Sequence, residues 1–306
     1  MLTSLIGFYI ASTLQPILPI NLEDNIQSLQ IIEQASLNIH KLDFHNLLSA
    51  SPIPIKKDTF VSPVIEAKSS VAIDNQTGEV LFEKNGNARR QIASITKLMT
   101  ATIILEENNL QDIVTISNTA SNTNGSQMFL RVNEQITVED LLYGVLINSA
   151  NDAAEALAEH NAGSIKKFVE KMNNKASELG LLNTRFQNPI GFDHRYNYSS
   201  AIDVAKLARY AYQKSFVQEA ATIQELEVMS VDKQYTHDLE TTNELLGSYL
   251  NIKGLKTGKT ELAGLCHVSV AENDEGNDII TVVLGSPDRF RESKVLIDWI
   301  FRAYIW

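Results

Sequence analysis

The chain has 306 residues, 44% of them hydrophobic and 21% charged, which is typical of a globular protein with one large domain or two smaller ones. Its formal net charge is −11, so there is no excess of Lys and Arg to neutralise phosphates, and we expect no nucleic-acid partner. A single cysteine, Cys266, excludes an internal disulfide, and the six histidines show no metal-ligand spacing, so we predict no metal and no cofactor.

Residues 1–20 form an apolar segment about as long as the hydrophobic part of a secretion signal or a short membrane span. No Lys or Arg precedes Lys41, and no clear A-x-A cleavage site follows the segment. We predict an export signal or an uncleaved membrane anchor; the alternative is an apolar arm that packs on the folded domain. Either form of export would place the protein outside the cytoplasm, in a periplasm or at the outer face of the cytoplasmic membrane.

Residues 21–63 show no chemical motif. Their last part carries prolines at positions 52, 54 and 63, which favours an extended linker. We therefore predict a linker region over 21–63 and a folded domain over 64–306. The domain is expected to open with a β-hairpin, because apolar stretches at 71–74 and 79–83 flank the turn sequence NQTG.

The middle of the domain is predicted to be helical. A first helix begins near Ser94, in the sequence SITKLMTATIILEEN. Two helical stretches over 137–161 meet at the sequence NSAND, an amphipathic helix follows with Gly180 at its end, and another helix begins after the serines at 199–200. We expect these segments to form an all-helical insertion between the flanking strands.

After Gly254 the sequence changes to strands around the turn DEGN, followed by a closing amphipathic helix over 289–306. Cys266 lies in one of these strands, where a small buried side chain is expected. The order is strand, strand, helices, strand, strand, helix. It predicts an α/β fold with an antiparallel sheet flanked by helices.

Three short motifs carry chemistry: Ser94-x-x-Lys97, Ser149-x-Asn151 and Lys256-Thr257-Gly258. Each alone has an ordinary explanation, since serine and asparagine cap helices, lysines lie on surfaces, and threonine and glycine occur in turns. All three together, in this order and in matching structural contexts, favour one catalytic site. By contrast, we interpret His194 as a loop residue and Asp152 and Glu155 as structural.

From about Val64 to Trp306 the sequence resembles the serine D-alanyl-D-alanine carboxypeptidases, the low-molecular-mass penicillin-binding proteins. The resemblance extends beyond the motifs to AIDNQTGEVLFEKN, GSQMFLRVNEQITVEDLLYGVLINSANDAAEALAEH, NTRFQNPIGFDH and GLKTGKTELAG. It implies the penicillin-binding/β-lactamase-like fold. Many members continue into a β-rich second domain, which we do not expect here, so any membrane attachment would come from the N-terminus.

Amide attack by a serine hydroxyl needs a base, and Lys97 can accept the proton of Ser94 only when it is neutral. Burial and a second ammonium, that of Lys256, would both lower the pKa of Lys97. Ser149 can relay a proton to the leaving amine. Asn151 can orient Lys97 and hold the amide of the substrate.

The resemblance also implies the substrate-binding residues. Lys256 and Thr257, followed by Gly258, would receive the terminal carboxylate, and the backbone N–H groups of Ser94 and Lys259 would form the oxyanion hole. Family members often have His or another polar residue at the position of Lys259. In this chain Lys259 would add a cation near the carboxylate. Arg289 matches a family arginine near the same carboxylate, although Arg291, two residues on, competes for that alignment.

The resemblance implies a serine D-Ala-D-Ala carboxypeptidase that acts on peptidoglycan stem peptides through an acyl-enzyme and is inhibited by β-lactam antibiotics. A D,D-endopeptidase or a transpeptidase of the same fold is the alternative. A β-lactamase is disfavoured because NTRFQNPIGFDH holds no matching Glu. A penicillin-binding sensor without turnover is a further alternative, which nothing in the intact motifs favours.

Overall fold

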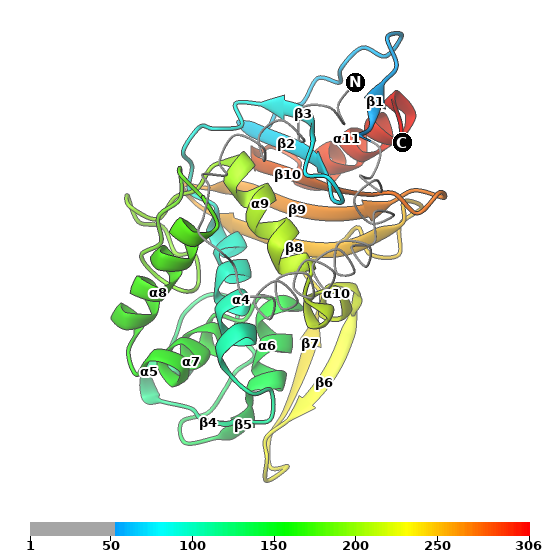
Figure 1. Ribbon diagram of the computed structural model, residues 1–306. Helices are drawn as coiled ribbons and strands as arrows, with labels where there is room; N and C mark the ends of the chain where they lie inside the picture. Colours follow the sequence, from blue (N-terminus) through cyan, green and yellow to red (C-terminus); the bar gives the residue numbers. More distant parts are fainter. Residues whose placement is uncertain (1–52) are drawn as a thin grey trace, which may run out of the picture. The chain divides into compact units, whose positions relative to one another are not determined.

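The computed structural model describes residues 53–306 (Figure 1). The predicted signal or anchor over 1–20, and the linker up to residue 52, lie outside the described residues. A five-stranded antiparallel sheet with strand order β3-β2-β10-β9-β8 forms the centre of the described part. Its strands are β2 (Ser69–Asp74), β3 (Val80–Lys84), β8 (Ile252–Thr260), β9 (Gly264–Glu272) and β10 (Asp278–Ser286).

Helices cover both faces of this sheet because its strands are apolar on both sides. On β10, Ile280 and Val282 belong to the core shared with α9 (Ala201–Tyr212), while Ile279 and Val283 pack in a second core with α11 (Arg289–Ala303). Figure 1 shows α9 and α11 on opposite faces of the sheet. The predicted α/β fold with an antiparallel sheet is confirmed.

The helical insertion lies between β3 and β8 in the sequence, as predicted. Its first helical turn is η1 (Ala93–Thr96), a 3₁₀ helix that continues directly into α4 (Lys97–Glu107). The other helices are α5 (Asn118–Ser121), α6 (Val138–Leu146), α7 (Asn151–Ala162), α8 (Ile165–Glu178), α9 and α10 (Ser215–Thr222). Side-chain caps fix several starts: the hydroxyls of Thr137, Ser164 and Ser200 accept N–H bonds from the first turns of α6, α8 and α9.

The insertion is not all-helical, which corrects the prediction. Two small antiparallel pairs lie within it, β4 (Ile113–Thr115) with β5 (Gln135–Thr137), and β6 (Glu225–Met229) with β7 (Thr236–Glu240). In addition, β1 (Ile55–Lys56), from the stretch interpreted as linker, pairs with β11 (Tyr304–Ile305) after the closing helix. Within residues 53–306 we find no helix that combines the length and the hydropathy of a membrane span.

A buried ion pair joins β7 to the segment before β5. His237 Nε2 lies 2.6 Å from Glu134 Oε1 and His237 Nδ1 lies 2.7 Å from the carbonyl of Met128, with both side chains almost fully buried. Burial alone would lower the pKa of His237, but the contact with Glu134 outweighs it and raises that pKa. Because the pKa of His237 is higher in the folded protein than in the unfolded chain, its protonation stabilises the fold. This contribution is complete below the ordinary histidine pKa and is lost as the pH rises through the pKa of the folded state.

We therefore expect Glu134→Gln to lower the free energy of unfolding by about 3 kcal/mol at pH 6, because it leaves a buried imidazolium without its counter-charge. The difference in the free energy of unfolding between Glu134→Gln and the wild type should become smaller at pH values above the raised pKa of His237. Urea unfolding at pH 6 and pH 9 measures both values. Glu227→Gln, on an exposed position of β6, is the matched control and should change stability by less than about 0.5 kcal/mol. Equal effects of Glu134→Gln at the two pH values would contradict the assignment.

Candidate active site

The first motif brings a hydroxyl and an amine together on one helical turn. Ser94 lies in η1 and is partly exposed, while Lys97 opens α4 and is fully buried. The Lys97 Nζ atom lies 3.0 Å from the Ser94 Oγ atom. Residues three apart face the same side of a helix, so the contact is local and needs no other element to form it. The predicted pairing of Ser94 with Lys97 is therefore present.

Lys97 has two further oxygen partners from distant parts of the chain. Its Nζ lies 2.6 Å from the Asn151 side-chain oxygen and 2.8 Å from the backbone carbonyl of Ile190. A neutral amine has two N–H groups and one lone pair. It can donate to these two oxygens and accept the hydrogen of the Ser94 hydroxyl, which is the arrangement that a base needs.

Electrostatics favour this neutral form. Burial lowers the pKa of Lys97 well below its ordinary value, and the nearby Lys256 ammonium lowers it further, while the Asp152 carboxylate opposes both. Asp152 is held away from direct contact because its oxygens accept the backbone N–H groups of Met128 and Leu130. Asp152 therefore has the structural role predicted for it.

The second motif forms the turn between α6 and α7. Ser149 adopts a left-handed backbone with φ of 65° and is almost fully buried. Such a conformation costs a non-glycine residue about 1 to 3 kcal/mol and is often retained at functional sites. Asn151 begins α7, and its side-chain nitrogen donates to the Asn124 carbonyl at 2.6 Å. That bond fixes the amide so that its oxygen points at Lys97.

The third motif lies on β8, the edge strand of the sheet. A Cβ atom on Gly258 would lie 3.1 Å from the backbone nitrogen of Ser94, so the glycine lets the strand pass tightly against η1. Thr257 is buried, and its hydroxyl lies 2.6 Å from that of Thr242. Lys259 follows on β8 with an exposed side chain. The three motifs thus converge at Ser94.

Lys256 is fully buried, and burial together with the Arg289 guanidinium lowers its pKa to about 7. Arg289 begins α11 and donates from Nη1 to the Gly258 carbonyl at 2.9 Å. Arg291 instead lines a separate surface hollow with Tyr249. The structure therefore places Arg289, and not its neighbour, beside the third motif.

The segment 188–193 completes the site, and no role was predicted for its residues. The segment supplies the Ile190 carbonyl that contacts Lys97. Next to it, Gly191 packs so closely on the backbone of Ala93 that a Cβ atom would have no room. The Asp193 carboxylate accepts from the Thr260 hydroxyl at 2.6 Å and so ties the segment to the end of β8. A backbone carbonyl has no sequence signature, so the sequence could have indicated only the glycine.

Three further sequence interpretations, those of Cys266, His194 and Glu155, agree with the structure. Cys266 is fully buried in β9, and His194 is exposed in a loop. Glu155 accepts a hydrogen bond from the Thr123 hydroxyl at 2.8 Å, a structural contact. Among residues 53–306, no group of three or more His, Cys, Asp or Glu side chains could hold a metal ion.

Comparison with known proteins supplies the class and the family. The fold is similar to that of the Streptomyces K15 DD-transpeptidase, with a TM-score of 0.75 and 33% identity over 79% of this chain and 100% of that one. It is also similar to penicillin binding protein 5 from Haemophilus influenzae, with a TM-score of 0.74 and 33% identity over 79% of this chain and 73% of that one. The class is that of the DD-peptidases.

A family model described as D-alanyl-D-alanine carboxypeptidase matches residues 56–288. The D-alanyl-D-alanine carboxypeptidase DacF of Bacillus subtilis is 38% identical over 247 residues, which are 78% of this chain. The chain belongs to the D-alanyl-D-alanine carboxypeptidase family, as its sequence motifs predicted. It spans about 63% of the length of that relative.

Proposed function

We propose that the protein is a serine-type D-Ala-D-Ala carboxypeptidase that removes the terminal D-alanine of peptidoglycan stem peptides. The single observation that supports this most directly is the 3.0 Å contact between Ser94 Oγ and a buried Lys97 amine of lowered pKa. The convergence of β8 and of the Ser149 turn on the same point supplies the groups that such a reaction needs.

In the proposed reaction, Ser94 Oγ attacks the carbonyl carbon of the terminal amide and its proton passes to Lys97. The backbone N–H groups of Ser94 and Lys259 hold the oxyanion, while Lys256, Thr257 and Arg289 hold the substrate carboxylate. The C–N bond then breaks, and Ser149 relays a proton to the leaving amine. Water next attacks the ester on Ser94 with Lys97 as base, which releases the shortened peptide and restores the serine.

The proposal also covers inhibitors and location. A β-lactam presents an amide and a carboxylate with a similar spacing, so it would acylate the same serine and, without rapid hydrolysis, remain bound. The substrate lies outside the cytoplasm, and the apolar residues 1–20 support an exported protein, either released or attached to the membrane through that segment.

A transpeptidase is the second candidate, because that is the name of a solved protein of the same fold. It differs only in the acceptor, an amine in place of water. We expect the protein to release D-alanine from a monomeric pentapeptide that ends in D-Ala-D-Ala, measured by chromatography, with little cleavage of cross-linked dimers. Transfer to an added amine, preferred over hydrolysis, would favour the transpeptidase, and preferred cleavage of dimers an endopeptidase. Rapid turnover of nitrocefin would indicate a β-lactamase.

A further inference from the structure

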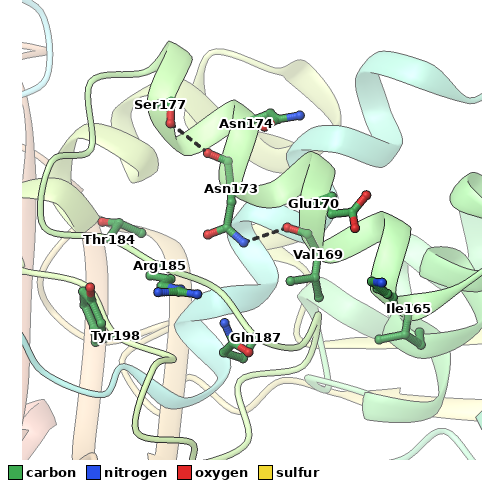
Figure 2. A pocket seen from close by; sticks show the side chains of 11 residues that line it. Ile165, Val169, Glu170, Asn173, Asn174, Ser177, Thr184, Arg185, Gln187 and Tyr198 are labelled. Carbon is green, nitrogen blue, oxygen red and sulfur yellow. Dashed lines mark hydrogen bonds between the residues drawn. The ribbon is translucent and has the colours of Figure 1, made fainter.

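A cavity of about 870 Å³ lies outside the three motifs, between α8 and the segment 184–198 (Figure 2). Its walls carry many amides and hydroxyls, namely those of Asn173, Asn174, Ser177, Thr184, Gln187 and Tyr198. Such a lining, with one aromatic ring, suits a ligand rich in hydroxyl and amide groups rather than an apolar one.

The two walls of the cavity are fixed to each other. The Asn173 side chain accepts from the Phe186 N–H at 2.9 Å and donates to the Phe186 carbonyl at 3.0 Å, so α8 holds the segment in place. The same side chain donates to the Val169 carbonyl, drawn in Figure 2. By contrast, the side-chain amides of Asn174 and Gln187 make no hydrogen bond within residues 53–306. The cavity is preformed and retains polar groups for a ligand.

Three arginines lie on or against the segment 184–198 although the chain is acidic, and Arg185 among them lines the cavity. The Arg185 guanidinium lies 5.2 Å from the Tyr196 ring centre, and Arg195 lies 4.4 Å from the same ring. Arg89 lies 5.1 Å from the ring centre of Tyr198. Within the described part of the chain, none of these arginines has an ion pair with a carboxylate.

The lining itself holds two cations, Lys166 and Arg185, against one carboxylate, Glu170, among the described residues. An arginine stacked on a ring keeps its N–H groups free in a fixed plane, which matches the two oxygens of a carboxylate. The charge and the amides together point to a ligand that carries both carboxylates and polar sugar or peptide groups.

The cavity shares its wall with the catalytic site. Gln187 is followed by Asn188, whose side-chain oxygen accepts the N–H groups of Gly191 and Phe192. This turn presents the Ile190 carbonyl to Lys97 at 2.8 Å. A polymer held in the cavity would therefore lie along the segment that ends beside the reacting serine.

We propose that this cavity binds an acidic glycopeptide portion, an N-acylated amino sugar with its carboxylate-bearing peptide, of the polymer whose peptide ends are cut at Ser94. The inference rests on the proposed function for the identity of that polymer. It adds a recognition site remote from the terminal dipeptide. Arg185 would bind the carboxylate, and Asn174 and Gln187 the amide and hydroxyl groups.

The test uses the full chain carrying Ser94→Ala, so that binding is measured without turnover. The probe is a disaccharide–peptide fragment that lacks both terminal D-alanines, titrated by calorimetry. We expect binding that weakens about tenfold in Arg185→Ala, the loss of one charge-assisted contact. Arg131→Ala is the matched control, because Arg131 is exposed and also stacks on a tyrosine, with 5.0 Å to the Tyr235 ring, but on another surface.

Equal affinity of Arg185→Ala and Arg131→Ala, or no binding of the fragment, would overturn the proposal. Equally tight binding of the sugar-free peptide would overturn the role of the sugar, and binding of a phosphate-rich glycerol polymer in place of the fragment would overturn the ligand class. These outcomes leave the proposed reaction untouched, because D-alanine release from a short peptide by the wild-type chain and by Arg185→Ala tests that separately.

Discussion

Ser94→Ala is expected to abolish covalent labelling by a β-lactam and to lower D-alanine release by a factor on the order of 10⁶, the scale seen when the serine of a serine hydrolase is removed. The reason is that Lys97 can accept a proton, but within residues 53–306 the Ser94 hydroxyl is the only hydroxyl in contact with its Nζ atom. Intact-protein mass spectrometry after incubation with penicillin, followed by peptide mapping, measures the label and locates it.

Ser121→Ala is the control for this experiment. Ser121 is partly exposed at the end of α5, outside the three motifs, and its hydroxyl donates to the Asn118 carbonyl at 3.3 Å. Penicillin should label the Ser121→Ala protein fully and at the same rate as the wild type. A penicillin adduct on the Ser94→Ala protein, or peptide mapping that places the wild-type adduct on another residue, would contradict the assignment of the nucleophile.

Lys256→Gln is expected to change the pH profile of acylation as well as its rate. In the wild type the rate should rise with pH as Lys97 loses its proton, and should fall again as Lys256, with a pKa of about 7, loses the charge that holds the carboxylate. Without the Lys256 charge, the pKa of Lys97 should rise. The acid limb should then move to higher pH, the alkaline limb should vanish, and the maximal rate should fall about 10- to 100-fold.

The second-order rate of acylation, followed from pH 5 to pH 10, measures this change. Lys253→Gln is the control on the same strand, because Lys253 pairs at 3.4 Å with Glu272 at the protein surface. Its profile should match that of the wild type. An acid limb that stays in place in Lys256→Gln would mean that Lys256 does not set the pKa of Lys97, whatever happens to the rate.

The side chains of the site could be predicted because their chemistry is visible in the sequence. Ser94 and Lys97 are brought into contact by helical spacing alone. Asn151 could be assigned to the same site because its motif is the second of three that follow one another in the expected order. The partners that the sequence did not indicate act through the backbone or through tertiary contacts. The Ile190 carbonyl and the Thr242 hydroxyl contribute only because distant segments pack there.

In the fold as well, features set by neighbouring residues could be predicted, and features set by contacts between distant segments could not. The hairpin of β2 and β3 and the caps of α6, α8 and α9 depend on neighbouring residues, and they were predictable. The β6–β7 pair was missed although Leu226 and Val228 alternate with polar neighbours, because short strands inside a helical region resemble loops. The pairing of β1 with β11 joins residues about 250 positions apart, so no local sequence pattern could predict it.

The three oxygens around the Lys97 amine come from η1, from the start of α7 and from the segment before α9. In an unfolded chain this lysine would be solvated and protonated, like any other, and the serine beside it would be inert. Reactivity is thus acquired only when separate parts of the chain have closed around one nitrogen. A covalent penicillin label would then count native molecules in a mixed preparation, because misfolded copies would stay unmarked.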